Sequence, residues 1–379
     1  MIKNIVLTIL IISLVLIFYK PSSNLTKIKF ATWGSKSEVE IIKPLLKEFE
    51  NKNPGVFVEF MHIPQNYFQK IHLLFASNTA PDVIFLNNHY LPMYADANLL
   101  EPLEKSDEFY SEALKALSWK GVLYAVPRDI SSLVIFYNKD LFKKNNVPYP
   151  HDDWTMQEFL ETAKKMTNDG VFGISFEEDS LFYLPYLMSF GGGILSDDLS
   201  ELIIDSPNSI EALEFYSNLR KKYHVAPLKS ESASATMAQM FLQQRLAMHL
   251  SGRWLVPKYR LDANFDWDVV RFPAGACGSI VPLDASGWAI TKSSKNKDLA
   301  YKLVHFLSSK QSSQKFTESG LITPARKDVA ESEYFIDNHK PQNAKVFIDA
   351  IATSKSTPVS VNYNEVLDIL YLKTEKFFN

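Results

Sequence analysis

The chain has 379 residues, of which 46% are hydrophobic and 22% are charged. This length exceeds the size at which one hydrophobic core usually stops growing, so we expect two lobes with enough apolar residues to fill both. The 40 Lys and Arg residues nearly balance the 43 Asp and Glu residues, and no long run has a single sign, which argues against nucleic acid as a partner.

The first 24 residues have the pattern of an export signal. Lys3 precedes an apolar run from Ile5 to Tyr19, and polar, turn-forming residues follow. The run is short for a membrane span, which needs about 20 residues. No small-residue cleavage site follows it, so an uncleaved anchor in the inner membrane stays open. Cys277 is the single cysteine, so no internal disulfide can form and none follows the run to accept a lipid. We expect a protein of a bacterial periplasm.

After this segment, short apolar runs alternate with longer amphipathic ones, which is typical of an α/β fold. The order of the first unit is strand, helix, strand, helix, strand, over residues 28–34, 38–55, 56–61, 67–76 and 81–86. This order predicts a right-handed parallel sheet, and ligands bind in the loops at the carboxyl ends of such strands.

Residues 121–148 hold two apolar stretches separated by the polar residues Arg128 to Ser132, and we expect this segment to cross between the lobes. The next segment predicts a helix with Thr155 as its N-cap and a glycine stop. Later strands are expected over residues 246–251, 266–273 and 286–291.

The common sequence motifs of catalysis are missing. The sequence contains no G-x-x-x-x-G-K-[ST] loop, no H-E-x-x-H pair and no G-x-S-x-G elbow. Its 8 histidines are dispersed, which signals no metal cluster. Acid clusters at residues 177–179 and 197–198 are the candidates for a glycan hydrolase, which needs two carboxylates about 5 to 10 Å apart. Neighbouring acids in polar loops are usually solvated, so we expect no enzyme, no cofactor and no metal.

A series of motifs resembles a known family. In chain order they are WG at residues 33–34, FENKNPG, VFVEF, NYFQK, APDVIFLN, LYAVP, FYNKDLFKKNNVP, WTMQEFLETAKKMT, QRLAMHLSGRW, SGWAITKSSKNKDLAYKLVHFLSSKQSSQKF and GLITPAR. The ordered set resembles the extracellular solute-binding proteins of family 1, the carbohydrate-type receptors of ABC importers. The likeness covers nearly the whole exported chain.

The resemblance implies a two-lobed periplasmic binding protein-like α/β fold with a hinge and a central ligand cleft. We expect a first lobe of residues 28–133 and 266–324 and a second lobe of residues 134–265 and 325–379. Such a receptor is expected to be a monomer that captures a sugar or oligosaccharide and delivers it to the permease subunits of an ABC transporter with their ATPase.

The resemblance leaves other ligands open. A branch that this chain resembles takes up glycerol 3-phosphate or its diesters. The tail segment TPVSVNYNEVLD lacks the arginine that such receptors can supply for phosphate, so we prefer a neutral carbohydrate. A glycerol phosphate receptor and a secreted glycan hydrolase remain the alternatives.

A sugar offers hydroxyl donors and acceptors and an apolar face, so its site needs planar polar side chains and aromatic platforms. Trp33 ends the first strand and either faces the solute or packs in the core. The resemblance places Tyr67, Asn88 and Ser131 at ligand positions, with a helix-surface aromatic and a helix cap as alternatives for the first two. Asp129 either contacts the solute or only pairs with the arginine before it.

The candidates in the second half of the chain lie beside small residues and are Gly252, Arg253, Trp254, Ser286 and Trp288. A small residue lets a solute approach the backbone closely while the neighbouring indole supplies a flat face. The alternative for Trp288 is core packing, because an alternating strand must turn some residues inward. Arg326 either reaches a polar solute or pairs with an acid at the hinge.

Overall fold

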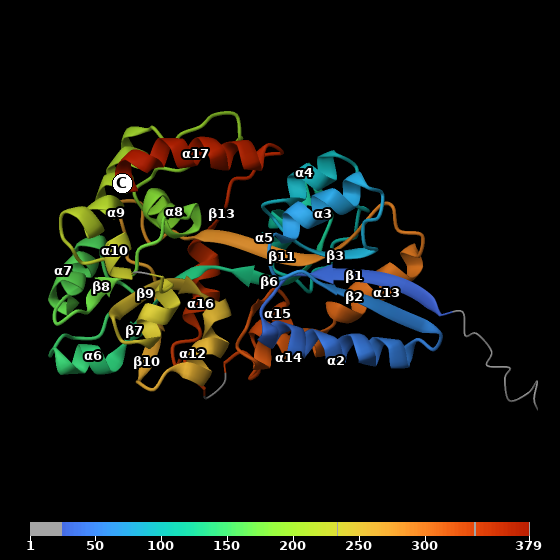
Figure 1. Cartoon of the computed structure of the whole chain (residues 1–379), viewed down its shortest axis with the longest axis horizontal. Helices are drawn as coiled ribbons and strands as arrows, with labels where there is room; N and C mark the ends of the chain where they lie inside the picture. The colour runs from blue at the N-terminus through green and yellow to red at the C-terminus, as the bar shows by residue number, and fades with distance from the viewer. Residues whose placement is uncertain (1–24, 233, 337–338, 379) are drawn as a thin grey trace, which may run out of the picture.

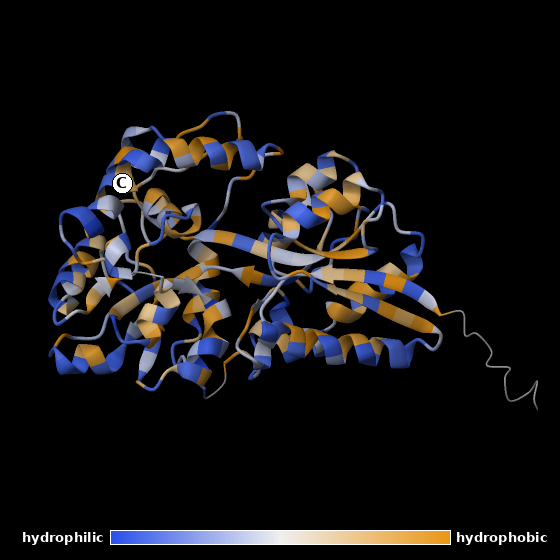
Figure 2. Cartoon of the chain, viewed as in Figure 1, coloured by the Kyte–Doolittle hydropathy of each residue, from blue (hydrophilic) through white to orange (hydrophobic). Residues whose placement is uncertain are grey.

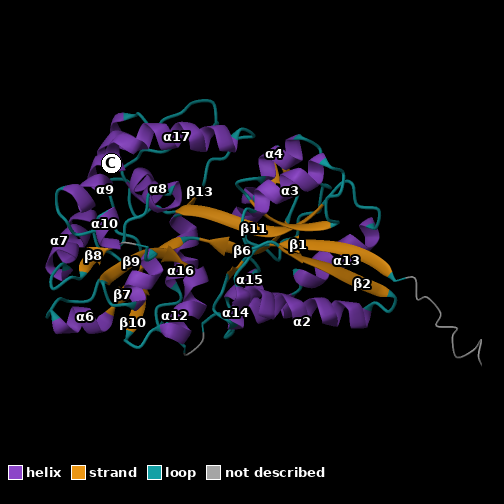
Figure 3. Cartoon of the chain, viewed as in Figure 1, coloured by secondary structure: helices purple, strands orange, loops and turns teal. Residues whose placement is uncertain are grey.

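The computed structural model describes residues 25–378 except 233, 337 and 338, so the predicted export signal lies outside the described residues. Figure 1 shows two lobes side by side, and in each a sheet is covered by helices on both faces (Figure 3). Within the described ranges, no helix is long and apolar enough to cross a membrane.

The first lobe is built around a mixed sheet with the strand order β12-β6-β11-β3-β1-β2, and β13 pairs with β11. Its strands are β1 (Thr26–Thr32), β2 (Val56–His62), β3 (Val83–Asn87), β6 (Val126–Ser131), β11 (Pro282–Ile290), β12 (Thr323–Pro324) and β13 (Lys355–Ser356), and a separate hairpin joins β4 (Ser118–Trp119) and β5 (Val122–Leu123). Strand β1 is parallel to β2 and β3, which confirms the predicted parallel unit. Strand β11 comes from late in the sequence and pairs antiparallel with β3 and β6.

Helices flank this sheet on both sides (Figure 1). They are α2 (Lys36–Lys52), α3 (Tyr67–Ala76), α4 (Leu91–Asp96), α5 (Ser111–Ala116), α13 (Lys297–Leu307), α14 (Lys310–Glu318) and α15 (Lys327–Ala330). Helix α2 shows why they form: the Ser35 hydroxyl accepts a hydrogen bond from the Glu38 N–H at its start, and Ile42, Leu45 and Phe49 at helical spacing are buried against the sheet. Figure 2 shows apolar and polar residues alternating along α2, and the residues of α2 packed in the core are the apolar ones.

The second lobe is built around a sheet with the order β10-β7-β9-β8. Its strands are β7 (Leu133–Asn138), β8 (Phe172–Ile174), β9 (Leu246–Gly252) and β10 (Trp267–Val270). Its helices are α6 (Lys139–Lys144), α7 (Met156–Met166), α8 (Ser180–Ser189), α9 (Pro207–Lys221), α10 (Lys229–Ser232), α11 (Met237–Leu242), η1 (Arg253–Leu255), α12 (Val256–Asp262), α16 (Val346–Asp349), η2 (Ala350–Thr353) and α17 (Tyr363–Phe378). The Thr155 cap is confirmed, because its hydroxyl and the Glu158 side chain cap α7 reciprocally.

The chain first crosses between the lobes at Ser132, the residue that separates β6 from β7. The crossing was predicted, but the polar residues before it form part of β6 and not a loop. Arg128 and Asp129 are buried there because the Arg128 guanidinium donates to the Asp129 carboxylate at 2.6 Å and to Glu38. The guanidinium also lies 4.0 Å from the centre of the Phe85 ring.

The structure corrects the expected division of the lobes in three segments. Strand β10 pairs with β7, which puts residues 267–270 in the second lobe. Helix α15 and strand β13 lie with the first sheet, because α15 packs against α14 and β12, and β13 pairs with β11. The sequence pattern of these short elements does not reveal which sheet they join. Phe272 and Val281 are buried in the same core as β7 and β9, so we propose that the second lobe runs from residue 133 to 281 and resumes after residue 330, apart from β13.

Candidate functional site

A cavity of about 480 Å³ lies between the two lobes. The first lobe lines it with Trp33 after β1, Asn87, His89 and Tyr90 at the end of β3, Ser131 on β6, and Asp284 and Ser286 on β11. The second lobe contributes the start of α8, Trp254 on η1, and Tyr363 with an apolar stripe on α17. These residues come from segments spread between positions 33 and 370 and make a mixed polar and aromatic surface.

A smaller cavity of about 180 Å³ adjoins the first and shares Trp33, Ser131, Trp254 and Ser286 with it. The other polar residues that line it are Glu38, Arg128, Asp129, Arg253 and Thr323. Asp129 is held by Arg128, and burial raises the pKa of the Asp129 carboxyl although that neighbour opposes the shift. The two cavities therefore combine hydroxyls, carboxylates and two indoles.

The structure brings six predicted residues to these cavities. Trp33, Ser131, Trp254 and Ser286 line both, and Asp129 and Arg253 line the smaller one. Trp33 is partly buried, and its ring lies 5.0 Å from the Tyr67 ring and 4.2 Å from the Phe85 ring, centre to centre. Trp254 is 36% exposed. Gly252 lies beneath it, where an added Cβ atom would come within 1.8 Å of the Trp254 ring.

Besides Gly252, four predicted contacts line neither of the two cavities. Tyr67 is buried in the first core, and its hydroxyl donates to the Ala31 carbonyl at 3.1 Å. Arg326 is held at the first lobe by ion pairs to Glu108 and Asp328, as its alternative predicted. Asn88, directly after β3, and Trp288, on β11, lie beside the cavity without lining it.

Asn88 supports the site from behind. Its amide donates to the Asp284 carboxylate at 3.0 Å and accepts from the Ala285 N–H at 3.1 Å. It lines a separate cavity of about 620 Å³ near α5. Its side chain therefore positions the strand that carries Asp284.

Trp288 is fully buried, as its alternative reading expected. It lies two residues after Ser286, and β11 pairs with β3 in an unbroken register over both residues, so the two share one face. The irregularity in the pairing of β11 with β6 is an extra residue, Arg128, in β6. Trp288 lies farther along β11 and packs in the core, 5.4 Å from the Phe30 ring and 4.6 Å from the Phe85 ring, centre to centre.

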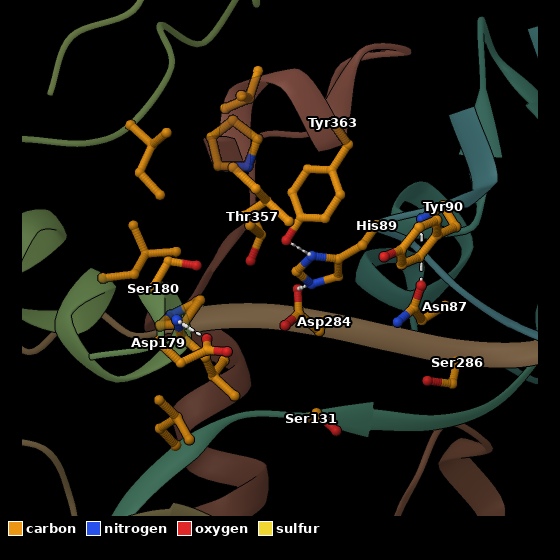
Figure 4. Close-up of a pocket in the computed structure, with 18 of the residues that line it drawn as sticks. Asn87, His89, Tyr90, Ser131, Asp179, Ser180, Asp284, Ser286, Thr357 and Tyr363 are labelled. Atoms are coloured by element: carbon orange, nitrogen blue, oxygen red, sulfur yellow. Dashed lines mark hydrogen bonds and ion pairs between the residues drawn. The ribbon is translucent and has the colours of Figure 1, made fainter. Parts of the chain in front are cut away.

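A polar network at the cavity was missed by the sequence reasoning (Figure 4). The His89 imidazole bridges the two lobes, with Nε2 2.9 Å from the Asp284 carboxylate and Nδ1 2.5 Å from the Tyr363 hydroxyl. Asp179 also lines the cavity, and its carboxylate caps α8 by accepting from the Leu181 N–H at 2.9 Å. We had expected Asp179 to be only a solvated acid.

Some sequence signals could have identified these residues. His89 follows directly after the predicted strand end at Asn87 and Asn88. Asp284 precedes Ser286 by two residues, the spacing that puts both on one face of a strand. No comparable signal marks Tyr363, which meets His89 across 274 positions of sequence.

Two structural comparisons show the fold. A substrate-binding protein of an ABC transporter from Listeria monocytogenes, solved in complex with cycloalternan, is 27% identical, matches 93% of each chain and superposes with a TM-score of 0.86. The GacH receptor of Streptomyces glaucescens, solved without ligand and with acarbose, is 24% identical over 93% of this chain and 92% of its own, with a TM-score of 0.84.

Two sequence comparisons agree with the structural ones. A family model described as bacterial extracellular solute-binding protein matches residues 45–343. The galactooligosaccharide-binding protein of Bacillus subtilis is 23% identical over 353 residues, which cover 89% of this chain and 82% of that protein. The fold, the cavity between the lobes and the family match point to the same class of protein.

Proposed function

Because the chain belongs to the bacterial extracellular solute-binding proteins, we propose that it is a receptor that closes on a sugar or oligosaccharide in the cleft between its lobes. The observation that carries this proposal is that Trp33 from the first lobe and Trp254 from the second line one cavity, beside hydroxyl, amide and carboxylate groups. Indoles cover the apolar face of a sugar ring, and the polar groups satisfy its hydroxyls. The names of the relatives support the same ligand class.

The charge of the cavity favours a neutral ligand over a phosphate ester. Among the described residues that line the main cavity there is no lysine or arginine, whereas Asp179 and Asp284 both face it. A phosphate dianion in the main cavity would be repelled by these carboxylates, and His89 is the one basic side chain among its described lining residues. In the adjoining cavity Arg128 is already neutralised by Glu38 and Asp129, and Arg253 is the other cation. The glycerol phosphate alternative therefore has less support than the carbohydrate.

The same carboxylates argue for a binding role without catalysis. A hydrolase acid needs a raised pKa so that it holds a proton near neutral pH. Burial opposes ionisation of Asp284, but His89 and the hydrogen bonds outweigh it and hold the pKa of Asp284 below its ordinary value. Asp284 is therefore an unsuitable proton donor, and Asp129, whose pKa burial raises, is held by the Arg128 guanidinium. We propose that the protein is not an enzyme.

We further propose that the receptor acts as a monomer in the periplasm, where it delivers its solute to the permease and ATPase of an ABC importer. Family membership supports an extracytoplasmic site of action. Light scattering of the purified chain tests the monomer, because its mass of 43.2 kDa doubles in a dimer. Fractionation of cells tests whether the N-terminal segment retains the protein at the membrane.

A thermal-shift screen tests the ligand class. It uses maltotriose, galactooligosaccharides, cycloalternan, glycerol 3-phosphate and glycerophosphocholine. A ligand at 100 times its Kd stabilises the folded state by about 2.7 kcal/mol, which raises the melting temperature by several degrees. We expect at least one saccharide to raise it and to be recovered unchanged. A shift with the glycerol phosphates alone contradicts the carbohydrate assignment, and cleaved products contradict the non-catalytic one.

A further inference from the structure

A hydrogen-bonded chain of three side chains crosses the cleft (Figure 4). Asp284 on β11 and His89 after β3 belong to the first lobe, whereas Tyr363 begins α17, which packs against α9 in the second. The His89 imidazole is 2.9 Å from Asp284 through Nε2 and 2.5 Å from the Tyr363 hydroxyl through Nδ1. The rings of His89 and Tyr363 also meet edge to face at 5.0 Å between centres. The network thus connects the two lobes at the wall of the cavity.

The hydrogen bonds of the network keep one ring nitrogen of His89 protonated, whereas the protonation of the other nitrogen can change. An ionised Asp284 only accepts hydrogen bonds, so Nε2 carries a proton in either charge state of the imidazole. In the neutral ring, Nδ1 accepts the proton of the Tyr363 hydroxyl. In the charged ring, Nδ1–H donates to the Tyr363 oxygen instead, and the hydroxyl proton becomes available to another acceptor. Tyr363 lines the cavity, so a solute bound there lies within reach of this hydroxyl.

The groups around His89 favour its charged form. Burial disfavours the imidazolium, but Asp284 from β11 and Asp179 at the start of α8 outweigh this and raise the pKa of His89 above its ordinary value. Tyr90, the next residue, and Tyr363 from α17 are the other titratable groups close to it. Burial, followed by the nearby carboxylates, also raises the pKa of Tyr363, so its hydroxyl keeps its proton throughout the working range.

We propose that His89 is a positioning residue whose protonation turns the Tyr363 hydroxyl toward the solute and strengthens the connection between the lobes. This inference rests on the proposed saccharide-binding function. When His89 is charged, the cleft offers the solute one more hydrogen-bond donor. Binding therefore takes up a proton, and saccharide affinity falls as the pH rises through the titration of His89.

Titration calorimetry with maltotriose at pH 5.5, 7 and 8.5 tests this coupling. One hydrogen bond to a solute changes affinity by about three- to tenfold, so the wild-type affinity is expected to fall by that factor across the range. H89Q keeps an amide next to Asp284 but cannot titrate, and Y363F keeps the ring but loses the hydroxyl. Both variants are expected to show a flat pH profile. A flat wild-type profile, or the wild-type slope in either folded variant, overturns the inference.

A second measurement needs no solute. NMR of histidine-labelled protein reports the protonation of each imidazole nitrogen, and we expect His89 to titrate above 6.5, its ordinary value, with Nε2 protonated on both sides of the transition. D284N removes the carboxylate and is expected to lower this titration point. An unchanged titration in D284N contradicts the network. If no saccharide in the screen binds, the proposed function fails, and this solute-free titration alone decides whether the network operates.

Discussion

Replacement of Trp254 by alanine is expected to weaken saccharide binding without unfolding the protein. The side chain is 36% exposed at the cleft. Taking about 250 Å² for a tryptophan side chain, about 90 Å² remains for a solute to cover. At about 25 cal/mol per Å² this area contributes about 2 kcal/mol, which corresponds to a roughly thirtyfold weaker Kd.

Titration calorimetry of W254A with a saccharide from the thermal screen measures this loss, and circular dichroism reports the fold. Trp119→Ala is a matched control, because Trp119 is a partly exposed tryptophan of the first lobe that lines the separate cavity near α5. The control is expected to bind within about twofold of wild type. If W254A keeps wild-type affinity in its folded fraction, or loses its fold altogether, the reasoning about a solute-facing indole is wrong.

Three further outcomes follow from the geometry. G252A would place a Cβ atom 1.8 Å from the Trp254 ring, so the indole must move and calorimetry should show a loss of binding close to that of W254A; unchanged affinity contradicts this contact. Arg128→Met leaves the buried carboxylates of Glu38 and Asp129 without their cation. Urea denaturation should therefore show a loss in the free energy of unfolding of about 3 to 5 kcal/mol that shrinks at acid pH. A loss below about 1 kcal/mol speaks against this buried ion-pair network. In the folded protein the pKa of Asp284 is lowered from 3.8 and that of His89 is raised from 6.5. The Asp284–His89 pair therefore stabilises the fold fully between pH 3.8 and pH 6.5. This stabilisation weakens as the pH falls through the folded pKa of Asp284 or rises through the folded pKa of His89. Melting temperatures of D284N should differ most from wild type inside that window, and a difference that is equal at every pH refutes the assignment.

Local patterns in the sequence predicted most of the secondary structure. The helix over residues 67–76 and the Thr155 cap are confirmed because they depend on spacing and capping within a few residues. The short strand β10 was given to the wrong lobe because its partner β7 lies far away in sequence. Pairing across such distances leaves no local periodicity to detect.

The same limit applies to the site. Trp33 and Trp254 were identified from strand ends and small neighbours, which are local features. The His89 network was missed because its members meet only after β11 inserts into the first sheet and α17 folds back over the cleft. Trp288 shows a further reason, since it shares the face of Ser286 but lies farther along β11, where it packs against Phe30 and Phe85 in the core.

The late arrival of β11 also affects how the polypeptide acquires its structure during synthesis. Strands β3 and β6 both pair with β11, which begins only at residue 282. A nascent chain that ends earlier holds these two strands with unsatisfied inner edges, and such edges recruit other strands. The first lobe therefore cannot join β3 to β6 until about three quarters of the chain has been translated, and β12 and β13 are added later still, although the first strand is among the earliest segments made.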